Sequence, residues 1–252
     1  MIKGLYSAAS GMVALQDRQD VIANNIANVS TAGFRRHMPV QLGFYETFTK
    51  ASHLPEYFET NSTPSGGVKL VETYPDLAQG GSRQTDNPLD VALVGPGFIA
   101  VNTKNGERYT RTGNLSQNSD GLLCTQHGEH VLGVNGEPID VRGGRVIIAG
   151  SGEVTVDGVP AGKIKVVEFA DPKRLMRAEE NLYRAEVETA SQMAPAADTQ
   201  LEQGMLEMAN VNLPTEMIQM TTGIRAYEAN QKVLTTVSDT MSTLIERVAM
   251  PQ

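Results

Sequence analysis

The feature that most constrains this sequence is a regular pattern of apolar residues near its C-terminal end. From Leu213 to Val248 these residues recur at alternating steps of three and four, and no glycine or proline falls between Gly223 and Pro251. This spacing predicts one long helix with a narrow apolar stripe. The stripe comprises Met217, Met220, Ile224, Tyr227, Gln231, Leu234, Ser238, Met241, Ile245 and Val248.

A matching stripe lies at the other end of the chain and predicts a helix over residues 2–29. It comprises Leu5, Ala8, Met12, Leu15, Gln19, Ile22, Ile26 and Val29. A lone helix of this kind is marginal in water, and burial stabilises each large apolar side chain by ~1.5–3 kcal/mol. We therefore expect the two helices to pair in a discontinuous coiled-coil domain made of residues 1–37 and 205–252.

The sequence between the helices has the pattern of a β domain, which we expect over residues 86–190. Short apolar runs alternate there with the turn dipeptides Asn105-Gly106, Asp120-Gly121, Asn135-Gly136 and Asp157-Gly158, which favour hairpins. No helix-length segment separates the runs, which argues against a parallel α/β sheet. The expected fold class is α+β, with a mostly antiparallel β domain inserted between the terminal helices. The expected strands are 89–94, 98–101, 122–123, 131–132, 146–148, 154–156 and 164–169.

Two segments should connect these parts. Residues 38–85 have weak periodicity, and we expect an extended or partly helical linker anchored by its aromatic side chains. These are Phe44, Tyr45, Phe48, Tyr57 and Phe58. Residues 191–204 are rich in small residues and contain Pro195, which predicts a return linker.

Composition limits the possible functions. The net charge of −8 argues against nucleic acid as the main partner, because phosphate binding needs clustered cations. No apolar stretch approaches the ~20 residues of a membrane span. Charges at Lys3, Asp17, Arg18 and Asp20 interrupt the N-terminal stretch, so no cleaved secretory signal is expected. A cytosolic protein fits these observations, and so does one exported without cleavage.

One group of residues has the chemistry of a zinc site. Cys124, His127 and His130 are spaced at steps of three, which suits metal ligands on a helix. Gly128, however, places them in a strand–turn–strand pattern, where the three side chains would not converge. No nucleophile elbow of the Gly-x-Ser-x-Gly kind is present. We expect no metal, no cofactor and no enzymatic activity, and keep a small zinc-dependent enzyme as the alternative.

The end of the first helix is rich in asparagine, with Asn24, Asn25 and Asn28 followed by Arg35 and Arg36. One interpretation is local capping and solvation. The other is a ladder of amides that hydrogen-bonds to neighbouring copies of the chain. The methionines of the helical ends also allow two interpretations, which are adaptable core packing and an adaptable surface for non-identical neighbours.

Three groups of motifs together resemble the bacterial flagellar rod and hook protein family. The N-terminal motif spans 23–36, where the asparagine-rich helix end precedes Thr31-Ala32-Gly33-Phe34 and two arginines. The C-terminal motifs span 207–212, 216–220 and 225–232, and the central motifs span 87–93, 97–98 and 109–114. The resemblance covers nearly the whole chain. The length of 252 residues favours a rod protein over the longer hook subunit. The segment 131–139 and the Thr112-Gly113-Asn114 form are more similar to the proximal rod subfamily than to the distal one.

The resemblance implies a structural subunit with terminal helices in an axial core and an outward β domain. Such subunits stack helically into the periplasmic drive shaft that transmits torque to the hook and filament. The implied partners are copies of the chain, other flagellar axial proteins and the flagellar type III export apparatus, which needs no cleaved signal. An adaptor that forms a closed dimer through its helices is a further alternative.

We expect the assembly interface to combine the two stripes with residues of the terminal motifs. The expected residues are Leu5, Met12, Leu15, Ile22, Asn24, Asn25, Ile26, Asn28, Phe34, Arg35, Met217, Met220, Ile224, Arg225, Tyr227, Leu234, Met241 and Ile245.

Overall fold

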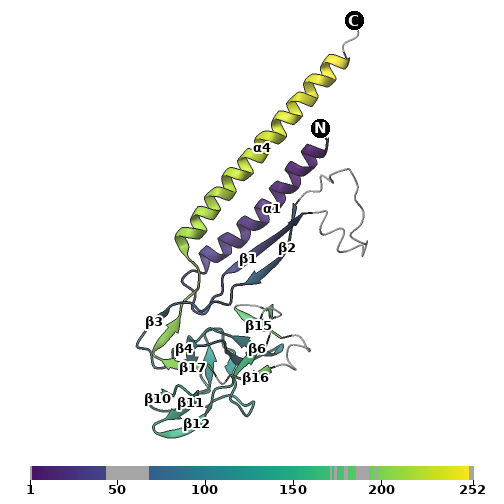
Figure 1. The fold of residues 1–252 in the computed structure, drawn as a ribbon. Coiled ribbons are helices and arrows are strands. Elements are labelled where there is room, and N and C mark those ends of the chain that lie inside the picture. Colours follow the sequence, from purple (N-terminus) through teal and green to yellow (C-terminus); the bar gives the residue numbers. More distant parts are fainter. Residues whose placement is uncertain are drawn as a thin grey trace. The chain divides into compact units, whose positions relative to one another are not determined.

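The computed structural model divides the chain into two compact units (Figure 1). The helical unit contains Met1–Ala27, His37–Tyr74 and Asn212–Gln252, and the β unit contains Asn28–Arg36 and Pro75–Val211. The structure describes residues 2–43, 68–170, 172, 175–178, 181–185, 193–196 and 198–249. The predicted α+β class, with a mostly antiparallel β region between two terminal helices, is confirmed.

Two long helices form most of the helical unit. Helix α1 spans Ile2–Ala27 and helix α4 spans Leu213–Ala249, close to the bounds expected from the apolar stripes. They lie side by side and antiparallel, as Figure 1 shows, with the Nε2 of Gln19 donating to the main-chain oxygen of Met220 at 3.3 Å. The main-chain N–H of Thr215 donates to the Oδ1 of Asn212 at 3.1 Å, which caps the start of α4.

The residues of α4 that face α1 differ in part from the expected stripe. At every second position of that stripe, the residue facing α1 is the one immediately before the expected residue. The N-terminal stripe is buried or half-buried as predicted, and Met220, Tyr227, Leu234 and Met241 of α4 are half-buried. The other positions on the face of α4 that is directed at α1 are Glu216, Gly223, Asn230 and Val237, which are buried or half-buried. Their C-terminal neighbours Met217, Ile224, Gln231 and Ser238 are exposed, so the heptad pattern predicted the helix but misplaced part of its seam.

Close approach of the helices explains the shift. A Cβ at Gly223 would stand 2.9 Å from the Nε2 of Gln19, and one at Gly11 would stand 3.5 Å from the Nδ2 of Asn230. Because glycine has no side chain, these positions allow the two backbones to come close. An isoleucine in place of Gly223 would hold the helices apart, so the larger residue of the pair, Ile224, is directed outward.

A two-stranded sheet, β1 (His37–Gly43) and β2 (Val68–Pro75), accounts for part of the segment expected to be a linker. Strand β1 contacts α1 within the helical unit. The five aromatic residues expected to act as anchors, Phe44, Tyr45, Phe48, Tyr57 and Phe58, lie outside the described residues.

The β unit is built from short strands whose pairings are antiparallel throughout its described residues. Its largest sheet has the order β14-β15-β6-β5-β9-β8-β7, with β13 pairing both β5 and β16. The smaller sheets are β10-β11-β12, β17-β4 and β18-β3. The bounds are β3 Ser82–Gln84, β4 Val91–Val94, β5 Phe98–Thr103, β6 Gly106–Thr110, β7 Leu115–Gln117, β8 Leu123–Thr125, β9 His130–Val131, β10 Val146–Ile148, β11 Glu153–Val156, β12 Val159–Lys163, β13 Val166–Phe169, β14 Met176–Arg177, β15 Leu182–Arg184, β16 Met193–Pro195, β17 Gln200–Gln203 and β18 Met205–Glu207.

The turn dipeptides mark turns, as the sequence predicted. Gly106, Gly121, Gly136 and Gly158 all have positive φ, between 79° and 94°. Glycine reaches this region without steric cost, so each dipeptide can reverse the chain tightly. Three of these turns, at Gly106, Gly121 and Gly158, join consecutive antiparallel strands.

Residues 191–204 are not simply a return linker. Strand β16 pairs with β13, and β17 pairs with β4 with Leu201 opposite Leu93. Leu201 is buried in the main core, which explains why this segment is part of the sheet structure. Strand β18 pairs with β3, so residues 205–207 also belong to the β unit and not to the helical part.

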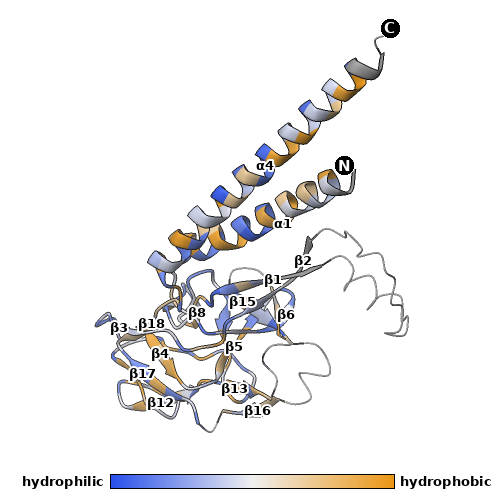
Figure 2. Cartoon of the chain, turned by 45° about the horizontal axis from the view of Figure 1, so that its top comes forward, coloured by the Kyte–Doolittle hydropathy of each residue, from blue (hydrophilic) through white to orange (hydrophobic). Residues whose placement is uncertain are grey.

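Two groups of buried side chains form the interior of the β unit. The larger is aliphatic and includes Leu93, Ile99 and Val101. The smaller is aromatic, with the rings of Phe98 and Phe169 in an edge-to-face contact at a centroid distance of 5.8 Å. Figure 2 shows hydrophobic residues along the strands of this unit and also at intervals along α4.

Gly113 provides a test of this packing. A Cβ at Gly113 would overlap the main-chain oxygen of Val91, whose N–H donates to the oxygen of Gly113 at 2.9 Å. We expect Gly113→Ala to destabilise the β unit by about 1–3 kcal/mol or more, because the backbone must move. Gly81→Ala is the control, since nothing lies within 4 Å of its Cβ. Urea unfolding followed by circular dichroism measures both, and equal stability of the two variants would contradict the expected overlap.

Candidate functional site

A buried asparagine connects three elements of the helical unit. Asn25 of α1 is 1% exposed. Its Nδ2 donates to the main-chain oxygen of His37 at 2.9 Å, and its Oδ1 accepts from the His37 N–H at 2.9 Å. The same Nδ2 lies 3.4 Å from the Oε2 of Glu216 in α4. One amide therefore satisfies both main-chain groups of His37 at the start of β1 and contacts the first turn of α4.

The two other asparagines of this region have different environments. Asn28 is half-buried, and its Oδ1 accepts from the hydroxyl of Thr31 at 3.2 Å. The Thr31 N–H donates to the Asn28 main-chain oxygen at 3.1 Å, which fits local capping after the helix. Asn24 is exposed. A ladder of amides between copies remains a prediction for Asn24 and Asn28, whereas Asn25 has an intramolecular role.

A buried carboxylate is the centre of the second cluster, which lies in the β unit. Glu207 is 1% exposed. Its Oε1 accepts from the Nη2 of Arg35 at 2.7 Å and from the Gly80 N–H at 3.0 Å. Its Oε2 accepts from the Nε of Arg111 at 3.1 Å. A buried carboxylate is costly unless it is paired and hydrogen-bonded, and here both oxygens are.

The two arginines also bind main-chain oxygens. The Nη1 of Arg35 donates to Ala78 at 2.7 Å, and Arg111 donates to Gly97 at 2.8 Å and to Gly95 at 2.7 Å. The guanidinium of Arg111 also lies 5.5 Å from the ring centroid of Phe98. Burial lowers the pKa of Arg111 below its ordinary value, while the neighbouring carboxylate of Glu207 partly offsets this change.

Main-chain contacts continue this connection between distant parts of the sequence. The Gly33 N–H donates to the main-chain oxygen of Glu207 at 2.7 Å, and the Arg36 N–H donates to the Oδ1 of Asn210 at 2.7 Å. The Nδ2 of Asn210 donates to the oxygens of Asp76 and Ala78. The segment 28–36 is therefore an integral part of the β unit and not of the helical domain expected for it.

Phe34 and Arg35 were expected to contact neighbouring copies, and the structure buries both inside the chain. The Arg35 guanidinium pairs with Glu207, which gives this residue an intramolecular role that sequence reasoning missed. Sequence reasoning also missed the ion pair between Glu207 and Arg111. A signal was present, because Arg35 follows the first helix and Glu207 precedes the last one, and the two ends were expected to meet.

The other expected interface residues fall into two groups. Those on α1 are buried or half-buried, and these are Leu5, Met12, Leu15, Ile22 and Ile26. On α4, Met220, Tyr227, Leu234 and Met241 are half-buried, whereas Met217, Ile224, Arg225 and Ile245 are exposed. The exposed group is available for contacts with another molecule.

Three apolar side chains of this exposed group form a repeat on α4. Met217 is 56% exposed, Ile224 44% and Ile245 64%, and they are separated by multiples of seven residues. Residues at such spacing share one face of a helix. We call this the outer stripe; its members Gln231 and Ser238 occupy the two intervening positions and are exposed too. Exposed apolar surface arranged on one face is typical of an interaction site.

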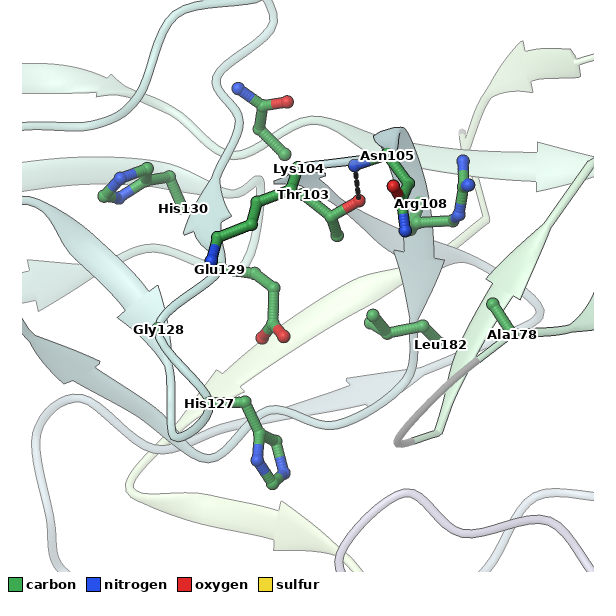
Figure 3. Close-up of a pocket in the computed structure, with 11 residues that line it drawn as sticks. Thr103, Lys104, Asn105, Arg108, His127, Gly128, Glu129, His130, Ala178 and Leu182 are labelled. Atoms are coloured by element: carbon green, nitrogen blue, oxygen red, sulfur yellow. Dashed lines mark hydrogen bonds between the residues drawn. The ribbon is translucent and has the colours of Figure 1, made fainter.

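The residues of the possible zinc site do not converge. Cys124 is buried in β8, with its Sγ 3.4 Å from the hydroxyl of Ser116. His130 lies opposite Cys124 in β9, and His127 is exposed in the turn between the strands. Figure 3 shows His127 and His130 pointing in different directions. Within the described residues, no group of three or more His, Cys, Asp or Glu side chains could hold a metal ion, so the zinc-enzyme alternative has no support.

The Asn25 contacts lead to a stability prediction. Asn25→Ala removes the side-chain amide that bonds to both main-chain groups of His37, and we expect a loss of about 1–3 kcal/mol in the unfolding free energy of the helical unit. Gln16→Ala, at an exposed position of the same helix, should change stability by less than about 0.5 kcal/mol. Thermal unfolding followed by far-ultraviolet circular dichroism measures both. Equal melting temperatures would show that the Asn25 contacts are not stabilising.

The buried charge cluster gives a second prediction. Glu207→Gln leaves Arg35 and Arg111 buried without a counter-charge, and we expect it to destabilise the β unit by about 3–5 kcal/mol. Glu202→Gln, at an exposed position of neighbouring β17, is the matched control and should be close to neutral. Calorimetric unfolding distinguishes them. A Glu207→Gln protein as stable as the control would contradict the proposed role of the carboxylate.

Across the part of the chain that the structure describes, no helix combines the length and apolar character needed to cross a membrane. Comparison with known protein families gives three matches. Residues 5–35 match the model "Flagella basal body rod protein", and residues 92–157 match "Flagellar hook protein FlgE/F/G D1 domain". Residues 202–247 match "Flagellar basal body rod FlgEFG protein C-terminal".

Curated relatives are similar over nearly their whole length. The flagellar basal-body rod protein FlgG of Bacillus subtilis is 32% identical, covering 97% of this chain and 98% of the relative. FlgF of Caulobacter vibrioides is 33% identical over 98% of both chains. FlgG of the same organism is 35% identical over 93% of this chain and 95% of the relative. The chain therefore belongs to the flagellar basal-body rod protein family.

Proposed function

We propose that this protein is a structural subunit of the flagellar basal-body rod and assembles through its terminal helices. The observation that carries the proposal is the outer stripe of α4, where Met217, Ile224 and Ile245 stay exposed although α4 already packs against α1. Burial of each such side chain against a neighbouring copy stabilises the contact by ~1.5–3 kcal/mol. The relatives named as rod proteins support the same function.

The length of α4 gives a second argument. Gly11 lies against Asn230 in the antiparallel pair, and the start of α1 at Ile2 is nine positions before Gly11. The start of α1 therefore corresponds to about Asp239, and the remainder of α4 to Ala249 extends past it. Leu244 and Ile245 in this extension are exposed. A helix from another subunit would cover them.

A contact of this kind gives a filament if its two sides differ. The outer stripe lies on one face of α4, and a neighbouring copy would meet it with a different surface, so the contact is heterologous. Heterologous contacts that do not close into a ring produce an open helix. The subunits would then form a close-packed helical core that transmits torque to the hook and filament, with the β units outside it.

We place the protein in the proximal part of the rod, as a FlgF-type subunit. The segment 131–139 and the Thr112-Gly113-Asn114 form support this position over that of a distal, FlgG-type subunit. Relatives of both names are similar to the chain at comparable identities, between 32% and 35%. The proposal includes export through the flagellar type III apparatus without a cleaved signal, and a location in the rod that crosses the periplasm.

The test uses a motile bacterium that lacks its own FlgF and receives this protein. We expect the unchanged protein to restore swimming and to be recovered in isolated basal bodies. Ile224→Asp places a charge in the outer stripe and should reduce its incorporation into basal bodies by at least about tenfold, because a buried charge opposes packing. Thr222→Asp, at an exposed polar position two residues earlier and on another face of α4, should retain incorporation.

Two outcomes would change the proposal. Normal incorporation of Ile224→Asp would show that the outer stripe is not an assembly surface. Rescue of a strain lacking FlgG, and not of the strain lacking FlgF, would assign the chain to the distal rod. Circular dichroism of the purified variants checks that Ile224→Asp folds as the control does.

A further inference from the structure

Helix α1 has one face that the described part of the chain leaves exposed. In the helical unit, α1 lies between α4 and strand β1 and contacts both (Figure 1). Its N-terminal stripe faces α4, and Asn25 bonds to His37 at the start of β1. Seven exposed residues form a row on another side of the helix, which we call the open stripe: Tyr6, Ala9, Val13, Gln16, Asp20, Ala23 and Ala27.

The open stripe has the pattern of a surface that packs against a helix. Its residues follow one another at alternating steps of three and four, which places them on one face of α1. A helix face directed at water usually carries several charged residues, and Asp20 is the only one in this row. The short side chains of Ala9, Ala23 and Ala27 allow a second helix to approach closely.

The outer stripe of α4 in a second copy complements this face in size and charge. Its residues Met217 and Ile224 are large, exposed and apolar, whereas the open stripe is small at Ala23 and Ala27. Next to Ile224, Arg225 is exposed, as is Asp20 of the open stripe. Within the part of the chain that the structure describes, neither of these two charged residues forms an ion pair.

One register brings the two stripes together along most of α1. If two copies point the same way, α1 of one runs antiparallel to α4 of the other, as the two helices do within each copy. We place Asp20 opposite Arg225 of the second copy. Each residue of the outer stripe then falls between two of the open stripe, with Ile224 between Asp20 and Ala23, Gln231 between Val13 and Gln16, and Ser238 between Tyr6 and Ala9.

This register differs from the one within the chain. There, Gly11 lies against Asn230, whereas the contact between copies would put Asn230 four positions further along α1. Four residues of a helix span about 6 Å, so the two copies are displaced along the helix axis. A contact between two different faces with such a displacement does not close into a ring and continues as a helical array.

We propose that the open stripe of α1 receives the outer stripe of α4 from a second copy, with an ion pair between Asp20 and Arg225. This inference rests on the proposed rod function and identifies the surface that the outer stripe meets. Each copy then uses α1 toward one neighbour and α4 toward another.

Disulfide cross-linking between separately tagged copies in isolated basal bodies tests the contact. One copy carries Ala23→Cys and the other Ile224→Cys, and we expect a cross-linked dimer after mild oxidation. A second pair, Ala9→Cys with Ser238→Cys, should cross-link as well. Thr222→Cys is at the same level of α4 but on another face, and it should not cross-link to Ala23→Cys. The unchanged chain, whose Cys124 is buried, serves as background.

Reversal of the two charges tests the ion pair. Asp20→Arg and Arg225→Asp each place like charges together, and we expect each to lower incorporation into basal bodies at least about threefold. The double variant D20R/R225D restores opposite charges and should recover most of the incorporation. Circular dichroism of the purified variants checks that the single changes leave the fold intact.

The outcomes separate this inference from the proposed function. Absence of either expected cross-link in basal bodies that contain the subunits overturns the contact and leaves the rod function in place. The same holds if D20R/R225D enters basal bodies no better than the single variants, or if Thr222→Cys cross-links as well as Ile224→Cys does. An unchanged protein that never enters basal bodies overturns both.

Discussion

The β unit depends on the buried carboxylate of Glu207. Two guanidinium groups from distant parts of the sequence, Arg35 and Arg111, meet at its two oxygens, and each arginine also satisfies main-chain oxygens of nearby loops. Burying three charged groups is unfavourable unless all are paired at once. The cluster therefore forms only when the segment 28–36 and strand β18 come together, which makes the N-terminal segment a structural part of a domain built largely from later sequence.

The helical unit uses a different kind of connection. Asn25 completes the hydrogen bonds of His37 at the start of β1 and contacts Glu216 at the first turn of α4. Along the rest of the pair, glycines allow close approach, and this directs the apolar residues of the outer stripe away from α1. Packing within the chain and exposure of an apolar face thus have the same cause. A rod subunit needs both properties, because it must fold and still contact its neighbours.

The side chains of Cys124, His127 and His130 in the β unit do not converge on one site. Cys124 is buried against Ser116, and the two histidines near it point apart (Figure 3). The β5–β6 and β8–β9 turns line one polar hollow, to which Lys104, Arg108 and Glu129 contribute charged side chains. Both turns belong to hairpins of the largest sheet of the β unit.

The sequence by itself determined the two long helices, their apolar stripes and the positions of hairpin turns such as that at Gly106. These features follow from local periodicity and from backbone preferences of single residues, which the chain expresses without long-range contacts. Only the tertiary structure decided that Gly223 rather than Ile224 faces α1, that residues 200–203 are a strand, and that Arg35 pairs with Glu207. Each of these depends on which distant surface a residue meets, and heptad spacing or composition contains no information about the shape and charge of that surface.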